Sequence, residues 1–448
     1  MPTRRTVLRG SAAAAALAAM GARVGDLEAA GAVERAPDAV ASAGDDTLPA
    51  PPPHVPPETL ARDEGYWRRV ARQFDVAERP INLEAGFFGL MARPVLAAYQ
   101  RHVVRVNREG AAFARREYPA LARAVRARVA EALGVGADEL AFARNATEAL
   151  QTMIRQYQRL APGDTVLFAD LDYPAMQDAM RGLAAARGAS VATLDLPEPA
   201  TREAVLDAYA AALERHPRTR LVLLTHVNNK TGLVHPVREL TAMAAARGAD
   251  VVLDAAHAFG QIPLSLPAIG APFVGVNLHK WIGAPVGVAA FYIRRDRLDA
   301  IAPAPGEPPP HDRIDSRLHT GTTDFAAVMA VAEALDFQAT IGVEAKAARL
   351  RYLRDRWAVP ARAIPGVDIL TPDDPALVGA ITSFRLRGDG DARRNAEIAR
   401  TLVDEFGIFT VARSGLARGD CVRVTPALHS APAHVDRLVE ALRVLAAR

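Results

Sequence analysis

Cysteine is almost missing from this sequence: Cys421 is the only one among 448 residues. A single cysteine cannot form a disulfide within its own chain, and it cannot supply a cluster of thiolates for a metal ion. Disulfide-stapled folds and cysteine-based metal centres are therefore excluded, and we expect no metal site.

Long apolar runs and an excess of one charge are missing too. No stretch after the N-terminus reaches the 18 or so apolar residues that a membrane-spanning helix needs, so we expect no integral membrane span. The 54 basic and 51 acidic side chains give a net charge of only +3, and the arginines are interleaved with carboxylates. This pattern argues against a nucleic-acid partner and is typical of a globular chain with more than one domain.

The first 30 residues have the order of an export signal. Arg4 and Arg5 precede an alanine-rich stretch at 11–20 that is too short to cross a membrane. The pattern resembles a twin-arginine signal peptide, so we expect export to the periplasm or beyond by the twin-arginine machinery. Residues 31–60 are rich in alanine and proline and are expected to form a linker.

Short apolar runs alternate with helical patterns in the rest of the chain. Runs without regular polar positions predict strands buried on both faces, at 165–169, 221–225, 251–254 and 273–277. Helical patterns lie between them, at 175–187, 202–215 and 237–247. The alternation predicts an α/β fold with a mainly parallel sheet covered by helices.

Two domains are expected. The large domain takes residues 61–325, including an N-terminal arm, and a smaller α+β domain takes residues 326–448. The strand candidates of the small domain lie at 380–386, 408–411 and 422–425.

Polar residues follow the predicted strands, where parallel sheets bind their ligands. Asn145 or Thr147 can cap a helix whose N-terminus would attract an anion. Asp254 ends one strand, and Lys280 follows another strand 26 positions later. A lysine amine and a carboxylate are what pyridoxal phosphate needs, for its Schiff base and for its protonated ring nitrogen. Taken singly, each of these residues also fits a purely structural role.

Six motifs in one order carry a family resemblance: NATEAL, DLDYPA, HVNNKTG, DAAHAFG, NLHKW and HTGTTD. Together they resemble the class V aminotransferase family of fold-type-I pyridoxal phosphate enzymes. The resemblance extends from about residue 60 to residue 448, and it is strongest to isopenicillin N epimerase-like members that carry a twin-arginine signal.

The resemblance implies a role for each matching residue. Lys280 would bind the cofactor covalently, Asp254 would pair with its ring nitrogen, and Tyr173 would stack on its ring. Further cofactor contacts are implied for Asn229, at the phenolic oxygen, for His257, near the ring, and for the phosphate-binding residues Ala146, Thr147, Asn277 and His279. Thr322 would reach the phosphate of a neighbouring subunit, which implies a homodimer.

The resemblance also implies a reaction at the Cα of an amino-acid or peptide-like substrate through an external aldimine. Arg423, with Arg413 as a second candidate, would hold the substrate carboxylate. Lys280 would remove the Cα proton, and epimerisation, transamination or elimination with C–S cleavage would follow. A binding module without turnover is a further alternative. A cysteine desulfurase is disfavoured, because no cysteine follows Arg413 closely and Cys421 is expected to be buried.

Overall fold

The computed structural model describes residues 48–448. The expected signal peptide and most of the expected linker lie outside the described residues. Within the described part, α1 (Pro57–Leu60) already begins inside the stretch expected to be linker, and its Leu60 is buried. Of the described helices, none alone is long and apolar enough to span a membrane, although the bent pair Phe325–Ile341 and Val343–Arg362 passes that test by length and composition.

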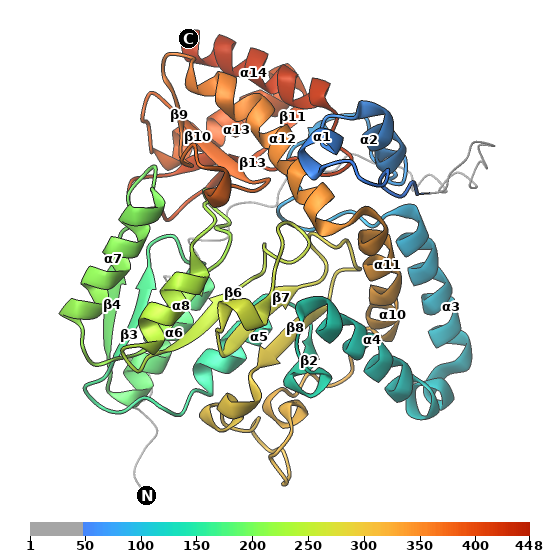
Figure 1. The fold of residues 1–448 in the computed structure, drawn as a ribbon, viewed down its shortest axis with the longest axis vertical. Helices are drawn as coiled ribbons and strands as arrows, with labels where there is room; N and C mark the ends of the chain where they lie inside the picture. Colours follow the sequence, from blue (N-terminus) through green and yellow to red (C-terminus); the bar gives the residue numbers. More distant parts are fainter. Residues whose placement is uncertain (1–47) are drawn as a thin grey trace, which may run out of the picture. The chain divides into compact units, whose positions relative to one another are not determined.

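The centre of the large domain is a seven-stranded sheet (Figure 1). Its strand order is β2-β8-β7-β6-β5-β3-β4; β8 runs antiparallel to both β2 and β7, and the other neighbouring pairs are parallel. The bounds are β2 Leu140–Ala143, β3 Thr165–Ala169, β4 Ser190–Leu194, β5 Thr219–Thr225, β6 Asp250–Asp254, β7 Phe273–Asn277 and β8 Ala289–Ile293. The predicted α/β fold with a mainly parallel sheet is confirmed.

Helices cover both faces of this sheet because the strands are apolar on both faces. In β3, Val166 and Phe168 pack under one layer of helices, while Leu167 and Ala169 pack under the other. The first layer contains α5 (Ala146–Arg155) and α6 (Pro174–Arg187); the second contains α4 (Tyr118–Leu133), α7 (Arg202–Arg215), α8 (Val237–Ala245) and α9 (Leu266–Ile269). Burial of each large apolar side chain contributes about 1.5–3 kcal/mol.

The small domain is built on a four-stranded antiparallel sheet in the order β12-β13-β10-β9. The strands are β9 Val367–Ile369, β10 Thr382–Leu386, β12 Val411–Arg413 and β13 Cys421–Val424, and the helices packed on them are α12 Val343–Arg362, α13 Ala392–Phe406 and α14 Pro432–Ala447. The expected smaller α+β unit is thus present, while its predicted bounds, 326–448, stay a prediction. Ahead of it, α10 (Phe325–Met329) and α11 (Val331–Ile341) lie beside α3 (Arg93–Arg116) and α4.

The N-terminal part of the described chain joins the two domains. After α2 (Glu64–Ala71), β1 (Ile81–Asn82) pairs in parallel with β11 (Ile408–Phe409) of the small domain. The chain then runs to the large domain, where the N–H of Gly89 donates to the carbonyl of His279 at 2.9 Å. Short 3₁₀ helices complete the elements, at Ala137–Glu139, Arg295–Ala300, Ile314–Arg317 and Pro375–Leu377.

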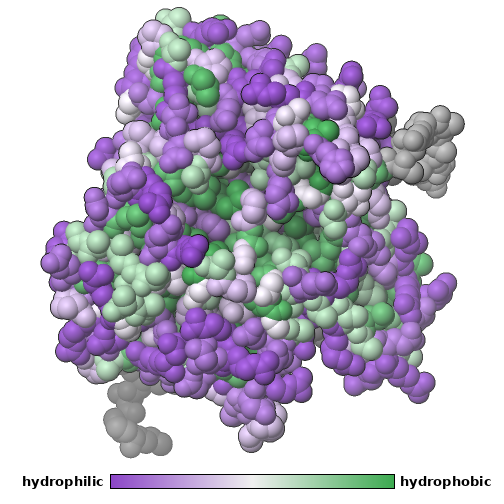
Figure 2. Space-filling view, in the orientation of Figure 1, coloured by the Kyte–Doolittle hydropathy of each residue, from purple (hydrophilic) through white to green (hydrophobic). Residues whose placement is uncertain are grey.

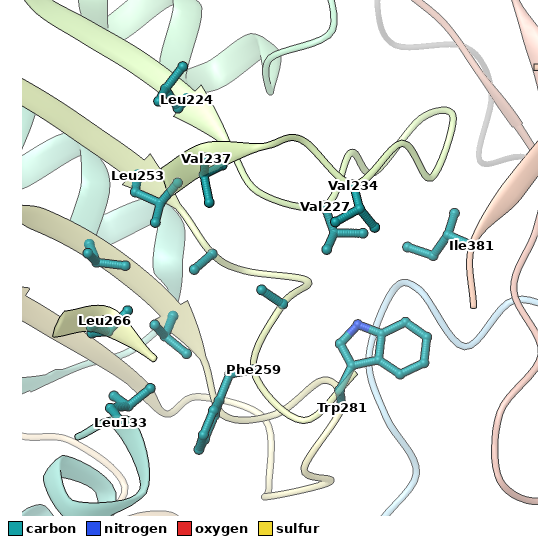
Figure 3. Packing of buried hydrophobic residues seen from close by; sticks show 14 of the residues in the cluster. Leu133, Leu224, Val227, Val234, Val237, Leu253, Phe259, Leu266, Trp281 and Ile381 are labelled. Carbon is teal, nitrogen blue, oxygen red and sulfur yellow. The ribbon is translucent and has the colours of Figure 1, made fainter. Parts of the chain in front are cut away.

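The surface and the core differ as expected for a globular fold. Figure 2 shows apolar residues gathered across the middle of one face, with hydrophilic residues covering most of the remainder. Figure 3 shows the core continuing past the strand residues Leu224 and Leu253 to Val227 and Val234, which lie toward Ile381 of the small domain. The loop after β5 is therefore anchored on both sides.

Candidate functional site

A cavity of about 240 Å³ lies at the carboxyl ends of the parallel strands. Its lining includes every residue predicted from the sequence to bind the cofactor or the substrate, except Thr322. The lining consists of Gly86, Phe87, Asn145, Ala146, Thr147, Tyr173, Thr225, Val227, Asn229, Asp254, Ala256, His257, Asn277, His279, Lys280, Arg413 and Arg423. Segments far apart in the sequence thus meet at one place.

Lys280 follows β7 and is largely buried in this cavity. Its Nζ lies 2.8 Å from Nε2 of His257. Burial, together with the positive charges of Arg423 and Arg413, lowers the pKa of Lys280 to about 7, against the partial opposing effect of Asp254. A substantial fraction of the amine is therefore neutral, and nucleophilic, near neutral pH.

The partners of His257 agree with a neutral amine. The indole N–H of Trp281 lies 3.3 Å from Nδ1 of His257, and an indole nitrogen can only donate. Nδ1 must then accept, so the proton of the neutral ring is on Nε2 and is donated to the lone pair of Lys280. Burial, followed by the charge of Lys280, lowers the pKa of His257 well below its usual value, which keeps the ring neutral.

Asp254 ends β6 with one of its two carboxylate oxygens free of any hydrogen bond from the described residues. One carboxylate oxygen accepts the N–H of Ala256 at 3.0 Å, and the described residues provide no further hydrogen bond to this group. Burial raises its pKa from the usual value. A protonated ring nitrogen would supply the missing donor. The amide oxygen of Asn229 is likewise buried without a partner among residues 48–448, so this amide is also available to a bound group.

The part of the cavity lined by the start of α5 is suited to an anion. Asn145 caps α5 by accepting the N–H of Glu148 at 2.8 Å, and the side-chain oxygen of Asn277 accepts the N–H of Ala146 at 2.8 Å. The N–H and hydroxyl of Thr147 are the donors that remain in this first helical turn. A phosphate at a helix N-terminus is stabilised by such donors and by the helix dipole.

His279 also lines the cavity, and its ring is held by the backbone. Nδ1 donates to the carbonyl of Val288 at 3.3 Å, which leaves Nε2 as the nitrogen that can face a ligand. Burial lowers the pKa of His279, whereas a bound dianion would favour protonation of Nε2.

Tyr173 and Thr322 occupy different settings. Tyr173 directly precedes α6, lines the cavity and is 39% exposed, so its ring is accessible to a ligand. Thr322 is exposed in the loop before α10 and does not line the cavity. Its predicted contact with a neighbouring subunit stays a prediction.

The two candidate arginines share a carboxylate that the sequence did not reveal. The Nε of Arg423 donates to Glu84 at 3.2 Å, and its Nη2 donates to the other oxygen of the same carboxylate. Arg413 donates to Glu84 at 3.2 Å. No local signal marks Glu84, because it follows the two-residue strand β1 and meets its partners more than 300 positions along the chain.

Cys421 does not reach the cavity. It is fully buried, its Sγ lies 3.8 Å from the carbonyl of Lys230, and burial raises the pKa of its thiol to about 12. A thiol in this state is a poor nucleophile.

Similar solved structures share this fold. A cysteine desulfurase from Escherichia coli superposes with a TM-score of 0.71 at 22% identity, covering 84% of this chain and 97% of that one. A cystine C–S lyase in complex with cysteine persulfide gives a TM-score of 0.71 at 22% identity, covering 82% and 98%.

Sequence comparisons extend to closer relatives. The chain is 33% identical to isopenicillin N epimerase of Streptomyces clavuligerus over 396 residues, which is 85% of this chain and 98% of that protein. It is 27% identical to a cysteine desulfurase of Pectobacterium atrosepticum over 389 residues, which is 78% and 90%. The model of the family described as aminotransferase class-V matches residues 93–429. The chain therefore belongs to the class V aminotransferase family, whose enzymes depend on pyridoxal 5′-phosphate.

Proposed function

We propose that this protein removes the Cα proton of an amino-acid or peptide-like substrate, as an isopenicillin N epimerase-like enzyme that either epimerises or transaminates it. The observation that carries the proposal is Lys280, of whose amine a substantial fraction is neutral near pH 7, and which lies beside Asp254 and His257 in one cavity. A base that works at neutral pH needs a pKa close to that pH.

The residues of the cavity fit the cofactor. Asp254 would hold the ring nitrogen, Asn229 the phenolic oxygen and Tyr173 the ring face, while Thr147 and His279 would hold the phosphate. When bound, pyridoxal 5′-phosphate withdraws electrons from the substrate's Cα and so acidifies its proton. Lys280 then takes that proton at Nζ, and His257 beside it orients the amine through Nε2.

A C–S lyase or β-eliminase is the main alternative, because a cystine C–S lyase and cysteine desulfurases are among the similar proteins. The thiolate mechanism of a desulfurase is disfavoured by Cys421, which is the only cysteine of the chain and is buried outside the cavity. A binding module without turnover is disfavoured by the intact Lys280 and Asp254.

Absorbance of the purified protein tests the covalent role of Lys280. The wild-type protein should show the near-visible band of lysine-bound cofactor, and Lys280→Ala should lose it. Borohydride reduction followed by peptide mapping should find the modification on Lys280. A wild-type protein without the band, or a modification on another lysine, would contradict the assignment.

Exchange of the Cα proton in deuterated water tests the reaction. L- and D-amino acids and short peptides that are substrates should take up deuterium at Cα, at a rate that Lys280→Ala reduces by orders of magnitude. The products then separate the branches: the opposite enantiomer indicates epimerisation, a keto acid with transfer of the amine indicates transamination, and sulfide or pyruvate indicates elimination. No exchange with any compound would favour the binding module.

The assembly and location belong to the same proposal. A homodimer is supported by large apolar side chains that are exposed at Phe87 (73%), Val104 (62%) and Val286 (63%), since exposed apolar surface commonly marks contact sites. Export is supported by the order of residues at 1–30. Sedimentation of the purified protein tests the first, and fractionation of expressing cells tests the second.

A further inference from the structure

Glu84 reaches the site because the N-terminal segment is threaded between the domains. The N–H of Thr425 donates to the carbonyl of Leu83 at 2.7 Å, and the N–H of Ala85 donates to the carbonyl of Thr425 at 3.1 Å. Leu83 is fully buried in the small-domain core. The backbone on both sides of Glu84 is thus fixed beside β13, which also carries Arg423.

The carboxylate of Glu84 bridges both arginines of the cavity. One oxygen accepts from Arg423 and from Arg413, and the other accepts from Nε of Arg423. The side chain of Glu84 is 6% exposed, so these interactions are shielded from water. Glu84 itself does not line the cavity; it contacts the two guanidinium groups that do.

This arrangement has a definite charge. Two guanidinium groups and one carboxylate leave one net positive charge, which is the complement of a single carboxylate. Neither arginine uses all of its N–H groups: Nε of Arg413 has no partner among the described residues, and Arg423 uses three of its five N–H groups, the third on the carbonyl of Asn229 at 2.6 Å.

We propose that Glu84 sets the charge selectivity of the substrate site: by bridging Arg423 and Arg413 it leaves one positive charge, which admits one carboxylate and disfavours a second close to it. The inference rests on the proposed function and narrows its substrate class. The favoured substrates carry a single carboxylate near the amine-bearing carbon and a neutral group where a dicarboxylic amino acid would carry a second.

Two ligands that differ by one charge test the inference. Succinate and succinamate have nearly the same shape, but succinate carries a second carboxylate where succinamate has a neutral amide. Their dissociation constants are measured by calorimetry on the cofactor-loaded protein, so the result does not depend on turnover. Wild-type protein should bind succinamate at least as tightly as succinate. Glu84→Gln should shift the ratio toward succinate by about tenfold or more, because a buried negative charge on the two guanidinium groups that line the cavity is lost.

Two control variants separate this effect from damage to the fold. Arg413→Gln removes a positive charge from the same group and should shift the ratio the opposite way, toward succinamate. Asp164→Asn removes a buried carboxylate from another arginine pair, with Arg218, that does not line the cavity, and should leave the ratio within about twofold.

The outcomes bear on separate claims. An unchanged ratio in Glu84→Gln, shifts of the same sign in Glu84→Gln and Arg413→Gln, or no binding of either ligand would overturn the inference. None of these results would affect the proposed function, which fails only if the Lys280 experiments fail.

Discussion

At the scale of single residues, the cavity is organised around the proton of Lys280. Burial and two arginines disfavour the charged amine, while Asp254 favours it. Burial and the arginines outweigh Asp254, so the pKa of Lys280 falls to about 7 from its usual value above 10. Burial and the nearby charge of Lys280 lower the pKa of His257 and keep its ring neutral, and Trp281 holds the ring in one tautomer. The amine is thus prepared for reaction before any ligand enters.

The capture of cofactor by the apoprotein should follow this titration. Only the neutral amine reacts with the aldehyde, so the rate of band formation should rise with pH and level off above about pH 8, half-maximal near 7. A lysine with an ordinary pKa would keep accelerating to about pH 10. Stopped-flow absorbance at fixed cofactor concentration measures the profile.

Arg413→Gln provides the matched comparison, because Arg413 is one of the charges that lower the pKa of Lys280. Its removal should move the midpoint of the profile to higher pH. A midpoint that stays in place, or moves to lower pH, would contradict this electrostatic account.

The residues of the site differ in how well a sequence can reveal them. Lys280, Asp254 and Asn229 belong to motifs directly after strands, and parallel strands bring such ends together. Glu84 belongs to no motif, and its position depends on pairing between β1 and β11, which are separated by more than 300 residues. Its effect on Arg423 could not be predicted either, since a sequence does not reveal which carboxylate a guanidinium will meet.

At the scale of elements, predictions succeeded where periodicity was strong. The strands expected at 165–169 and 273–277 match β3 and β7, and the helix at 202–215 matches α7. The sequence pattern did not single out β4, a sheet-edge strand with exposed side chains, or β8. The expected strand at 408–411 is divided in two, because β11 pairs with β1 while β12 pairs with β13.

Gly89 should be the most size-sensitive position of the N-terminal segment. A Cβ there would lie 1.8 Å from the backbone carbonyl oxygen of Lys280, so Gly89→Ala must push the segment away from the strand-end loop. We expect a loss of about 1–3 kcal/mol in the free energy of unfolding and weaker retention of cofactor. Urea denaturation and dialysis of the loaded protein measure the two effects.

Gly182→Ala is the control for Gly89→Ala. Gly182 lies exposed in α6, and a Cβ there would meet nothing within 4 Å. This substitution should be neutral or stabilising by up to about 1 kcal/mol, because alanine favours a helix. Equal changes in the free energy of unfolding for Gly89→Ala and Gly182→Ala would show that the close approach between Gly89 and Lys280 does not limit stability.

At the scale of the whole described chain, polar contacts fix the small domain to the large one around the cavity. Lys230 donates to the carbonyls of Asp170 and Gly415, each at 2.8 Å, and the N–H of Val234 donates to the carbonyl of Leu377 at 2.9 Å. Because Arg413 and Arg423 come from the small domain and Lys280 from the large one, the site is complete only when these contacts hold.

The buried pair of Glu198 and Arg385 should be the most costly of these contacts to break. Glu198 precedes α7 and Arg385 lies in β10; their side chains are each 7% exposed and are separated by 2.5 Å. Glu198→Ala leaves a buried guanidinium without its carboxylate, so we expect a loss of about 3–5 kcal/mol in the free energy of unfolding.

Two further variants decide whether burial is the cause of that cost. Adding Arg385→Met to Glu198→Ala removes the stranded charge and should restore much of the loss, since buried ion pairs replaced by apolar groups are often tolerated. Asp436→Ala breaks the exposed pair with Arg356, whose side chains are 38% and 42% exposed, and should cost no more than about 1 kcal/mol. Urea denaturation of the loaded protein compares all three. A double variant no more stable than Glu198→Ala would mean that the loss comes from displaced packing between the domains, because charge burial alone predicts recovery.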